Sequence, residues 1–187
     1  MRLAFLALTA CLLAAPAFAQ DAIKFPEKLD AKAAGYQMAY SDVGPVYVAG
    51  QPSEQAIRDL KAKGVKTIIN LRTQPEMDNR RQVPFDEAAL TKELGINYVH
   101  VPLGGPDTPY TPEAVEKVAD AIAKADGDVL LHCTVGWRAS HMWAAYLVKH
   151  KGLSEEEAIK QASAIYFNGY KPADGKLPFN ALLGKAE

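Results

Sequence analysis

The chain has 187 residues, of which 49% are hydrophobic and 23% are charged. This length and composition predict one globular domain with a sizeable core and exclude an intrinsically disordered chain. The 21 Lys and Arg residues balance 22 Asp and Glu residues, for a formal net charge of −1 at pH 7. The balance argues against nucleic-acid binding, which needs a basic excess, and against a polybasic membrane patch. Two cysteines cannot make a disulfide scaffold.

The first 19 residues have the three parts of a bacterial export signal. Arg2 supplies the positive charge, an apolar run extends from Leu3 to Ala15, and Ala17-Phe18-Ala19 offers the small residues of a cleavage site. We expect removal of this signal peptide before Gln20 and a periplasmic or secreted protein without stable membrane insertion, because the run is too short to span a bilayer. A lipid attachment site at Cys11 is disfavoured, because apolar residues continue beyond it.

Residues 20–35 show no convincing period and are expected to form a flexible lead-in, followed by one domain over residues 36–187. In that domain, short β-rich runs alternate with segments of helical periodicity. In chain order, we expect strands at Tyr36–Tyr40 and Val46–Ala49, a helix at Ser53–Lys63, a strand at Lys66–Leu71, a helix at Pro84–Leu94, a strand at Tyr98–Val101, a helix at Pro112–Ala125, a strand at Val129–His132, a helix at Ala139–Lys149 and a last helix capped by Ser154. The tail from Tyr166 to Glu187 is expected to pack as a lid or an edge.

The alternation of strands and helices predicts an α/β fold with a mainly parallel central sheet and helices on both faces. Ile68-Ile69 and Val129-Leu130-Leu131 are continuously apolar, which is typical of central strands buried on both sides.

The most informative segment runs from Val129 to Ser140: a buried strand leads into Cys133, then a short loop with one glycine, then Arg138 at the start of a helix. Backbone N–H groups of such a loop form an anion-binding nest, and the helix dipole adds positive potential. The guanidinium can grip two oxygens of an oxyanion, and the same field favours the thiolate form of the cysteine. Once the export signal is gone, Cys133 stands alone in the chain. The expected oxyanion-binding residues are Thr134, Val135, Gly136, Trp137 and Arg138, with Cys133 as the nucleophile.

The run His132-Cys133-x-x-Gly136-x-Arg138 resembles the signature of cysteine-dependent phosphatases of the protein-tyrosine and dual-specificity type. The upstream segments Gly50–Ser53 and Gly64–Arg72, together with Glu76, are similar to the bacterial beta-lactamase-hydrolase-like phosphatase domain. The resemblance covers about residues 45 to 165.

The resemblance implies a phosphatase-like fold and hydrolysis of a phosphorylated small molecule or protein without a cofactor or a metal. Cys133 would attack phosphorus to give a cysteinyl-phosphate, and Arg138 with the loop amides would hold the equatorial oxygens. In such enzymes an aspartate on a separate loop protonates the leaving oxygen. Asp107 is the only carboxylate of the matching loop, Pro102–Pro109, and is the candidate acid; the alternative is an ordinary turn-forming Asp.

The loop departs from the usual phosphatase pattern, because four residues rather than five separate Cys133 from Arg138. This shorter spacing resembles that of rhodanese-like sulfurtransferases, in which a cysteine persulfide occupies a smaller nest; the bacterial group named above also resembles it. Two alternatives therefore stay open: a sulfurtransferase that uses a Cys133 persulfide, and a non-catalytic oxyanion-binding module. The hydroxyl that usually follows the arginine is replaced by Ala139, which leaves Ser140 as a candidate partner of the thiolate.

Other polar residues are assigned supporting roles. His132 is expected to hold the loop at the end of a strand, and Arg72 is expected to brace the site through Glu76 rather than to reach the substrate. A metal site is disfavoured, because no pair among the candidate ligands has a familiar zinc spacing. Those candidates are His100, His132, Cys133 and His141.

Overall fold

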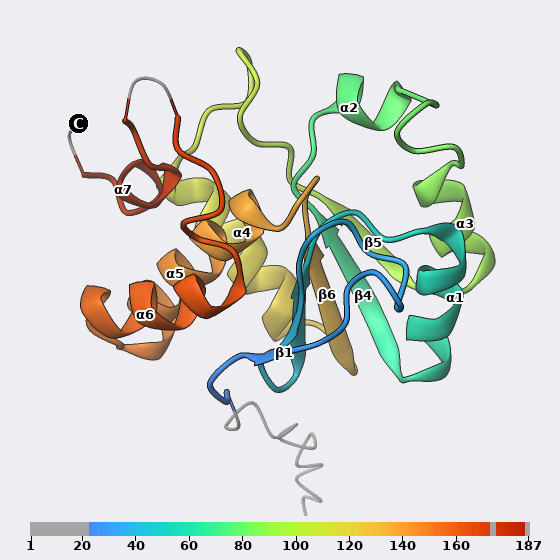
Figure 1. The fold of residues 1–187 in the computed structure, drawn as a ribbon, viewed down its shortest axis with the longest axis horizontal. Helices are drawn as coiled ribbons and strands as arrows, with labels where there is room; N and C mark the ends of the chain where they lie inside the picture. The colour runs from blue at the N-terminus through green and yellow to red at the C-terminus, as the bar shows by residue number, and fades with distance from the viewer. Residues whose placement is uncertain (1–22, 173–174, 186–187) are drawn as a thin grey trace, which may run out of the picture.

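A computed structural model describes residues 23–172 and 175–185; the expected export signal, residues 1–19, lies outside these ranges. Its centre is a six-stranded sheet in the order β1-β2-β3-β6-β4-β5 (Figure 1). The strands are β1 (Glu27–Lys28), β2 (Tyr40–Asp42), β3 (Val46–Ala49), β4 (Val65–Asn70), β5 (Asn97–His100) and β6 (Asp128–His132).

The four strands β3, β6, β4 and β5 are parallel, while β1 and β2 add an antiparallel edge. β6 occupies the middle, with Leu131 opposite Val48 of β3 on one side and Ile69 of β4 on the other. The strand that carries the expected nucleophile is therefore flanked by neighbours on both sides, and its carboxyl end opens between the loops that follow β3 and β4. This confirms the predicted α/β class with a mainly parallel sheet.

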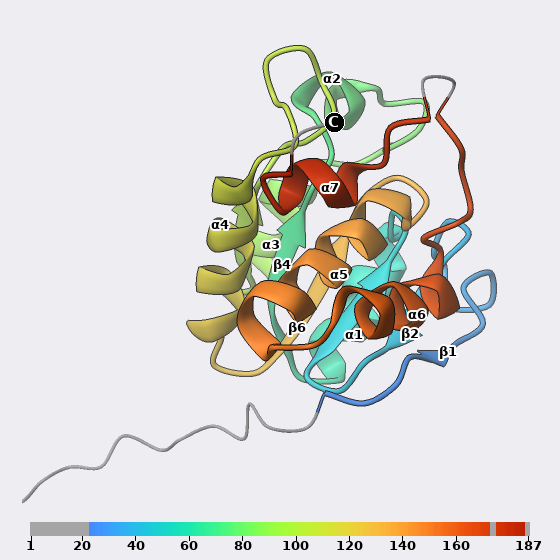
Figure 2. The same ribbon diagram turned by 90° about the vertical axis from the view of Figure 1, so that its left-hand side faces the viewer.

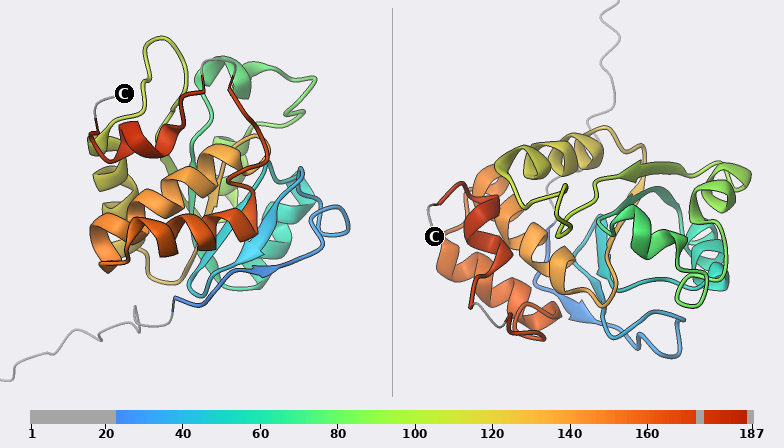
Figure 3. Two further views of the ribbon diagram at one scale, coloured as in Figure 1. Left: turned by 60° about the vertical axis from the view of Figure 1, so that its left-hand side comes forward. Right: turned by 90° about the horizontal axis from the view of Figure 1, so that it is seen from above.

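Helices cover both faces of the sheet (Figures 1 and 3). On one face, α1 (Glu54–Ala62) and α3 (Glu87–Glu93) pack on a core that includes Ile68 and Leu130. On the other face, α4 (Pro112–Ala123), α5 (Trp137–Lys151), α6 (Glu155–Ile165) and α7 (Pro178–Leu182) enclose a larger core that includes Ile69 and Leu131. Adjacent residues of one strand thus serve opposite cores, as the alternation of side chains along a strand requires. Within the described ranges, no helix has the length and apolar character needed to cross a membrane.

Most expected elements are present, and their caps explain their bounds. Ser53 caps α1 by accepting a hydrogen bond from the Ala56 N–H (3.2 Å), and Thr111 and Ser154 cap α4 and α6 in the same way. The expectation for Pro84–Leu94 began too early: Asp86 is the cap, because its carboxylate accepts from the Ala89 N–H (3.0 Å), and α3 starts at Glu87.

The predicted strand at Tyr36–Tyr40 was wrong over most of its length. Met38 has φ of 64°, in the left-handed region that breaks an extended run, and β2 begins only at Tyr40. Tyr36 forms only an isolated bridge with Pro52. Three short elements were not predicted: β1 inside the expected lead-in, α2 (Gln74–Asp78), and α7 in the tail.

The C-terminal tail folds back over the α5 side of the domain (Figure 2). α7 contacts α5 and α4, and its Phe179 and Leu182 are buried in the core of that face. Phe167, at the start of the tail, is buried with them. The tail therefore runs from the end of α6 past the first turn of α5, which begins beside Cys133.

Candidate active site

Cys133 lies directly after β6, at the carboxyl edge of the sheet, and its N–H donates to the carbonyl of Ala49 at the end of β3 (3.3 Å). The chain then turns through Gly136, which has φ of 93° and serves as the N-cap of α5. A Cβ at Gly136 would lie 2.5 Å from the Cβ of Ala39, so glycine is required both by the backbone conformation and by the close approach of the neighbouring loop. These contacts pin the loop from both ends.

The loop amides are available to an anion. Within the described part of the chain, the N–H groups of Thr134, Val135, Gly136 and Trp137 make no hydrogen bond to a protein acceptor. Unpaired N–H groups at a turn that opens a helix are the donors of an anion-binding nest, and the positive end of the α5 dipole lies at the same point. The unpaired amides and the start of α5 thus lie together beside Cys133.

Arg138 lies in the first turn of α5 and is firmly oriented. Its Nη1 donates to the carbonyl of Leu103 (2.7 Å) and to that of Leu71 (3.3 Å), at the ends of two neighbouring segments. Its Nη2 donates to the Thr134 hydroxyl (2.8 Å) across the loop. Burial by itself would lower the pKa of Arg138, but the hydrogen bonds to Glu76 and the electrostatic interactions with nearby groups outweigh it and raise that pKa.

Glu76 is the carboxylate partner of Arg138. Its Oε1 accepts from Arg138 Nη2 (2.6 Å) and from the Thr134 hydroxyl (2.7 Å), while its Oε2 accepts from Arg138 Nη1 (2.8 Å). Glu76 also closes the capping box of α2, because its Oε2 accepts from the N–H of Thr73 (2.8 Å). Burial would raise the pKa of Glu76, but these donors together lower it to about 2. The short helix α2 therefore places a carboxylate that is ionised at neutral pH against the Arg138 guanidinium.

Arg72, which was expected to brace the site through Glu76, is fully buried. Its Nη1 donates to Gln51 Oε1 (2.7 Å), its Nη2 donates to Gln82 Oε1 (3.1 Å), and its Nε lies 3.8 Å from Glu76 Oε1. Burial, the main cause, lowers the pKa of Arg72. The guanidinium points into the protein, where it ties together the segments that follow β3 and β4.

A pocket of about 260 Å³ opens over the loop. Cys133 is among its lining residues, although only 1% of the residue is exposed. One wall is aromatic: the Trp137 ring meets the Tyr170 ring edge to face, with centroids 5.1 Å apart. The complete lining is Cys133, Thr134, Val135, Trp137, Arg138, Tyr166, Gly169 and Tyr170. The tail thus contributes a wall that the motif itself did not indicate.

Asp107 lies at the tip of the loop between β5 and α4. It is exposed, in a turn closed by the Gly104 N–H on the Thr108 carbonyl (2.7 Å), and it is not among the residues that line the pocket. The loop itself starts at the site, because Leu103 binds Arg138.

The structure separates other candidates from the thiol. Ser140 donates its hydroxyl to the Trp137 carbonyl (2.7 Å) rather than to Cys133. His100 binds the Arg72 carbonyl through Nε2 (2.7 Å). The His141 ring contacts the Phe167 ring at a tilt of 43°, with centroids 3.8 Å apart, and burial lowers the pKa of His141 to about 3.

Sequence reasoning missed two residues of the site, Gln51 and Glu87. Glu87 is 2% exposed, and its carboxylate accepts from His132 Nε2 (2.9 Å) and from Gln51 Nε2 (2.7 Å). An acidic residue in the first turn of a helix ordinarily faces solvent, so nothing in the local pattern distinguished it. Gln51 lies in the segment Gly50–Ser53, which resembles the bacterial phosphatase domain, but the sequence assigned no role to its side chain.

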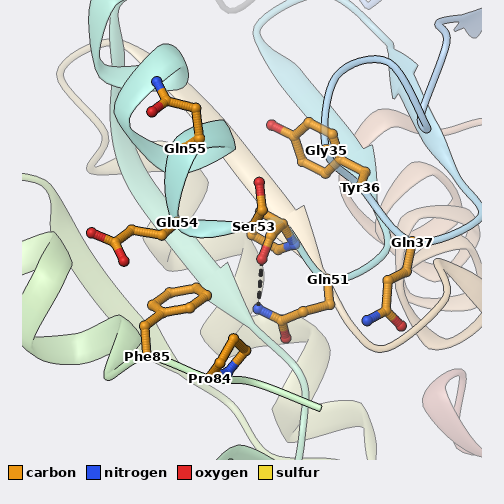
Figure 4. Close-up of a pocket in the computed structure, with 10 residues that line it drawn as sticks. Gly35, Tyr36, Gln37, Gln51, Ser53, Glu54, Gln55, Pro84 and Phe85 are labelled. Atoms are coloured by element: carbon orange, nitrogen blue, oxygen red, sulfur yellow. Dashed lines mark hydrogen bonds between the residues drawn. The ribbon is translucent and has the colours of Figure 1, made fainter. Parts of the chain in front are cut away.

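A second, larger pocket of about 530 Å³ lies on the α1 side of this network, with Tyr36, Gln51 and Phe85 among its lining residues (Figure 4). Gln51 lies between the two regions: its side chain lines this pocket, while its backbone N–H donates to the carbonyl of Thr134 (2.9 Å) in the Cys133 loop.

Solved structures with the same fold include proteins described as phosphatases or putative phosphatases. A DUF442 protein of Shewanella putrefaciens is 27% identical, with a TM-score of 0.55 over 70% of this chain and 80% of that one. TpbA of P. aeruginosa in complex with pTyr has a TM-score of 0.58 at 17% identity, over 90% of this chain and 92% of that one, which shows a common fold. The chain thus has the fold of the protein-tyrosine and dual-specificity phosphatase superfamily.

Within that superfamily, the chain belongs to the family described as DSP-PTPase phosphatase fused to NAD+ kinase, whose profile matches residues 31–176. It is also 33% identical over 97 residues to the Beta-lactamase hydrolase-like protein of Xylella fastidiosa, which confirms the resemblance found in the sequence. That alignment covers 52% of this chain and only 22% of the relative.

The lowered pKa of Glu76 predicts an acid-sensitive contribution to stability. Because the folded-state value is about 2 and the ordinary value 4.5, the carboxylate stabilises the fold above about pH 4.5 and loses this effect as the pH falls toward 2. Glu76→Gln should lower the free energy of unfolding by about 2 to 3 kcal/mol at pH 7 and by much less at pH 3. Urea unfolding at several pH values measures both. Glu54→Gln, at an exposed pair with Arg58, is the control; equal losses in the two variants would contradict this prediction.

Proposed function

We propose that the protein hydrolyses a phosphomonoester through a cysteinyl-phosphate on Cys133. The observation that carries this proposal is the placement of a thiol beside four unpaired loop amides and an oriented guanidinium, in one pocket. These donors suit the three equatorial oxygens of a phosphoryl group, whose charge must be met in the transition state. Membership in a phosphatase family supports the same chemistry.

In the first step, the Cys133 thiolate attacks phosphorus and forms an S–P bond while the bond from phosphorus to the leaving oxygen breaks. Asp107 donates a proton to that oxygen, so that an alcohol or a phenol leaves. In the second step, water attacks phosphorus and Asp107 takes a proton from that water. The S–P bond breaks, inorganic phosphate is released, and the thiolate is regenerated. The exposed loop that bears Asp107 must move over the pocket for both transfers, a motion for which its glycines and prolines provide hinges.

Purified protein should hydrolyse p-nitrophenyl phosphate, and Cys133→Ser should abolish turnover because an alcohol replaces the thiolate. Acid quench of the wild-type reaction followed by peptide mass spectrometry should find one phosphoryl group on Cys133. The short loop gives the sulfurtransferase alternative a direct test on the same samples: formation of thiocyanate from thiosulfate and cyanide. Thiocyanate without phosphatase turnover would replace this proposal, and vanadate binding without either reaction would leave an oxyanion-binding module.

The role of Asp107 predicts a dependence on the leaving group. Asp107→Asn should lower kcat about a hundredfold for phenyl phosphate, whose leaving oxygen needs a proton, and much less for p-nitrophenyl phosphate. Asp120→Asn, at an exposed surface pair with Lys124, is the matched control. Equal effects of Asp107→Asn on the two substrates would assign the proton to another group.

We further propose that the protein is exported to the periplasm, on the strength of the sequence of residues 1–19. Expression of the full chain in a Gram-negative host should give a periplasmic product that begins at Gln20, as determined by fractionation and N-terminal sequencing. A product that retains Met1 in the cytoplasm would contradict this.

A further inference from the structure

A chain of buried polar side chains runs from the loop after β4 to the residue before the nucleophile. Arg72 donates to Gln51 (2.7 Å), Gln51 donates to Glu87 (2.7 Å), and Glu87 accepts from His132 (2.9 Å). All four side chains are buried, with Gln51 the most exposed at 3%. They come from four separate segments: the turns after β3 and β4, the first residue of α3, and the last residue of β6.

Glu87 is the only one of these residues that bonds to the side chain of His132. A carboxylate can only accept hydrogen bonds, so Glu87 requires the proton of His132 to be on Nε2 and fixes the plane of the ring. Burial would raise the pKa of Glu87, but His132, Gln51 and Arg72 together lower it, so the carboxylate is ionised. An ionised carboxylate at this depth needs both of its partners, which makes the arrangement rigid.

The rigidity is transmitted to the Cys133 loop through the backbone. The carbonyl of His132 accepts from the Leu71 N–H (3.0 Å), and the carbonyl of Thr134 accepts from the Gln51 N–H (2.9 Å). The residues on both sides of Cys133 are therefore held by the same segments that hold Glu87, namely those of Arg72 and Gln51. Glu87 does not line the Cys133 pocket, so a change at Glu87 reaches the thiol either through these contacts or through the loss of its charge.

We propose that Glu87 is a positioning residue, which acts through His132 to set the start of the Cys133 loop and thereby the reactivity of the thiolate. This rests on the proposed role of Cys133 as the nucleophile, but it concerns the thiol itself and not the phosphoryl transfer. Glu87→Gln replaces one acceptor oxygen by an NH2 group, which faces a donor on either His132 or Gln51. No ionised acceptor remains, one of the two hydrogen bonds is lost, and the ring of His132 is no longer fixed.

The test is the rate at which iodoacetamide alkylates Cys133 in the full-length protein at pH 7, together with kcat and KM. Glu87→Gln should slow alkylation about tenfold, the factor that corresponds to loss of one hydrogen bond to a charged group. A merely structural role predicts the opposite sign, because a loosened fold exposes the buried thiol. Simple removal of a negative charge also predicts faster alkylation, since the thiolate would be favoured. Either result would overturn the proposal.

Glu93→Gln is the matched control, because Glu93 lies on the same helix with a 64% exposed side chain and pairs only with Arg58 at the surface. Its alkylation rate should stay within about twofold of wild type. The double variant Glu87→Gln/His132→Gln should react no more slowly than His132→Gln, because one residue acts through the other. A double variant whose alkylation rate is reduced by the product of the two single reductions would contradict this.

Should Glu87→Gln not fold, Glu87→Asp keeps the charge, shortens the reach to His132 and carries the same expectation. Because alkylation needs no turnover, absence of phosphatase activity in the wild type would refute the proposed function without deciding this test.

Discussion

The mutual neutralisation of buried charges at one edge of the sheet is the constraint on which the site depends. An isolated buried charge is costly, so each guanidinium and carboxylate here has to find its partner within a narrow geometry. Arg138 meets Glu76, and Glu87 meets His132. Because the partners come from different loops, pairing them brings together the segments after β3, β4 and β6 and the start of α3. The site is thus assembled by the same contacts that make burial of its charges tolerable.

The short loop changes how an oxyanion is held. With four residues between Cys133 and Arg138, the loop offers fewer backbone amides to the proposed oxyanion, and the Arg138 guanidinium would carry more of its binding. The structure secures that guanidinium with two carbonyls, a hydroxyl and a carboxylate. A side chain held this firmly loses little conformational entropy when an anion binds, which offsets part of the missing backbone donation.

Local chemistry in the sequence predicted the parallel core and the Cys133 loop. β3 was predicted to the residue and β6 within one, because continuous apolar runs between turns leave little choice. The strand at Tyr36–Tyr40 failed because the left-handed backbone of Met38 belongs to a tight turn, in which the Ala39 N–H donates to the Gln37 carbonyl (2.8 Å), and the residue type of Met38 does not indicate such a turn. The roles of Glu87 and of Tyr170 in the aromatic wall were not predicted either. Their roles come from contacts with residues distant in sequence, across the sheet or from the tail, and no local pattern records such contacts.

The order of the strands also determines when the site can form during synthesis. β6 is the last strand made, yet it is inserted between β3 and β4, which cannot pair with each other before it arrives. A nascent chain that ends before Asp128 therefore has a gap in the middle of its sheet, and completing the sheet depends on contacts between distant parts of the chain, which form slowly. Insertion of β6 brings Cys133 to the edge of the sheet in the same event. The Cys133 sulfur and the finished sheet consequently appear together, because a chain that ends before Asp128 does not yet contain Cys133.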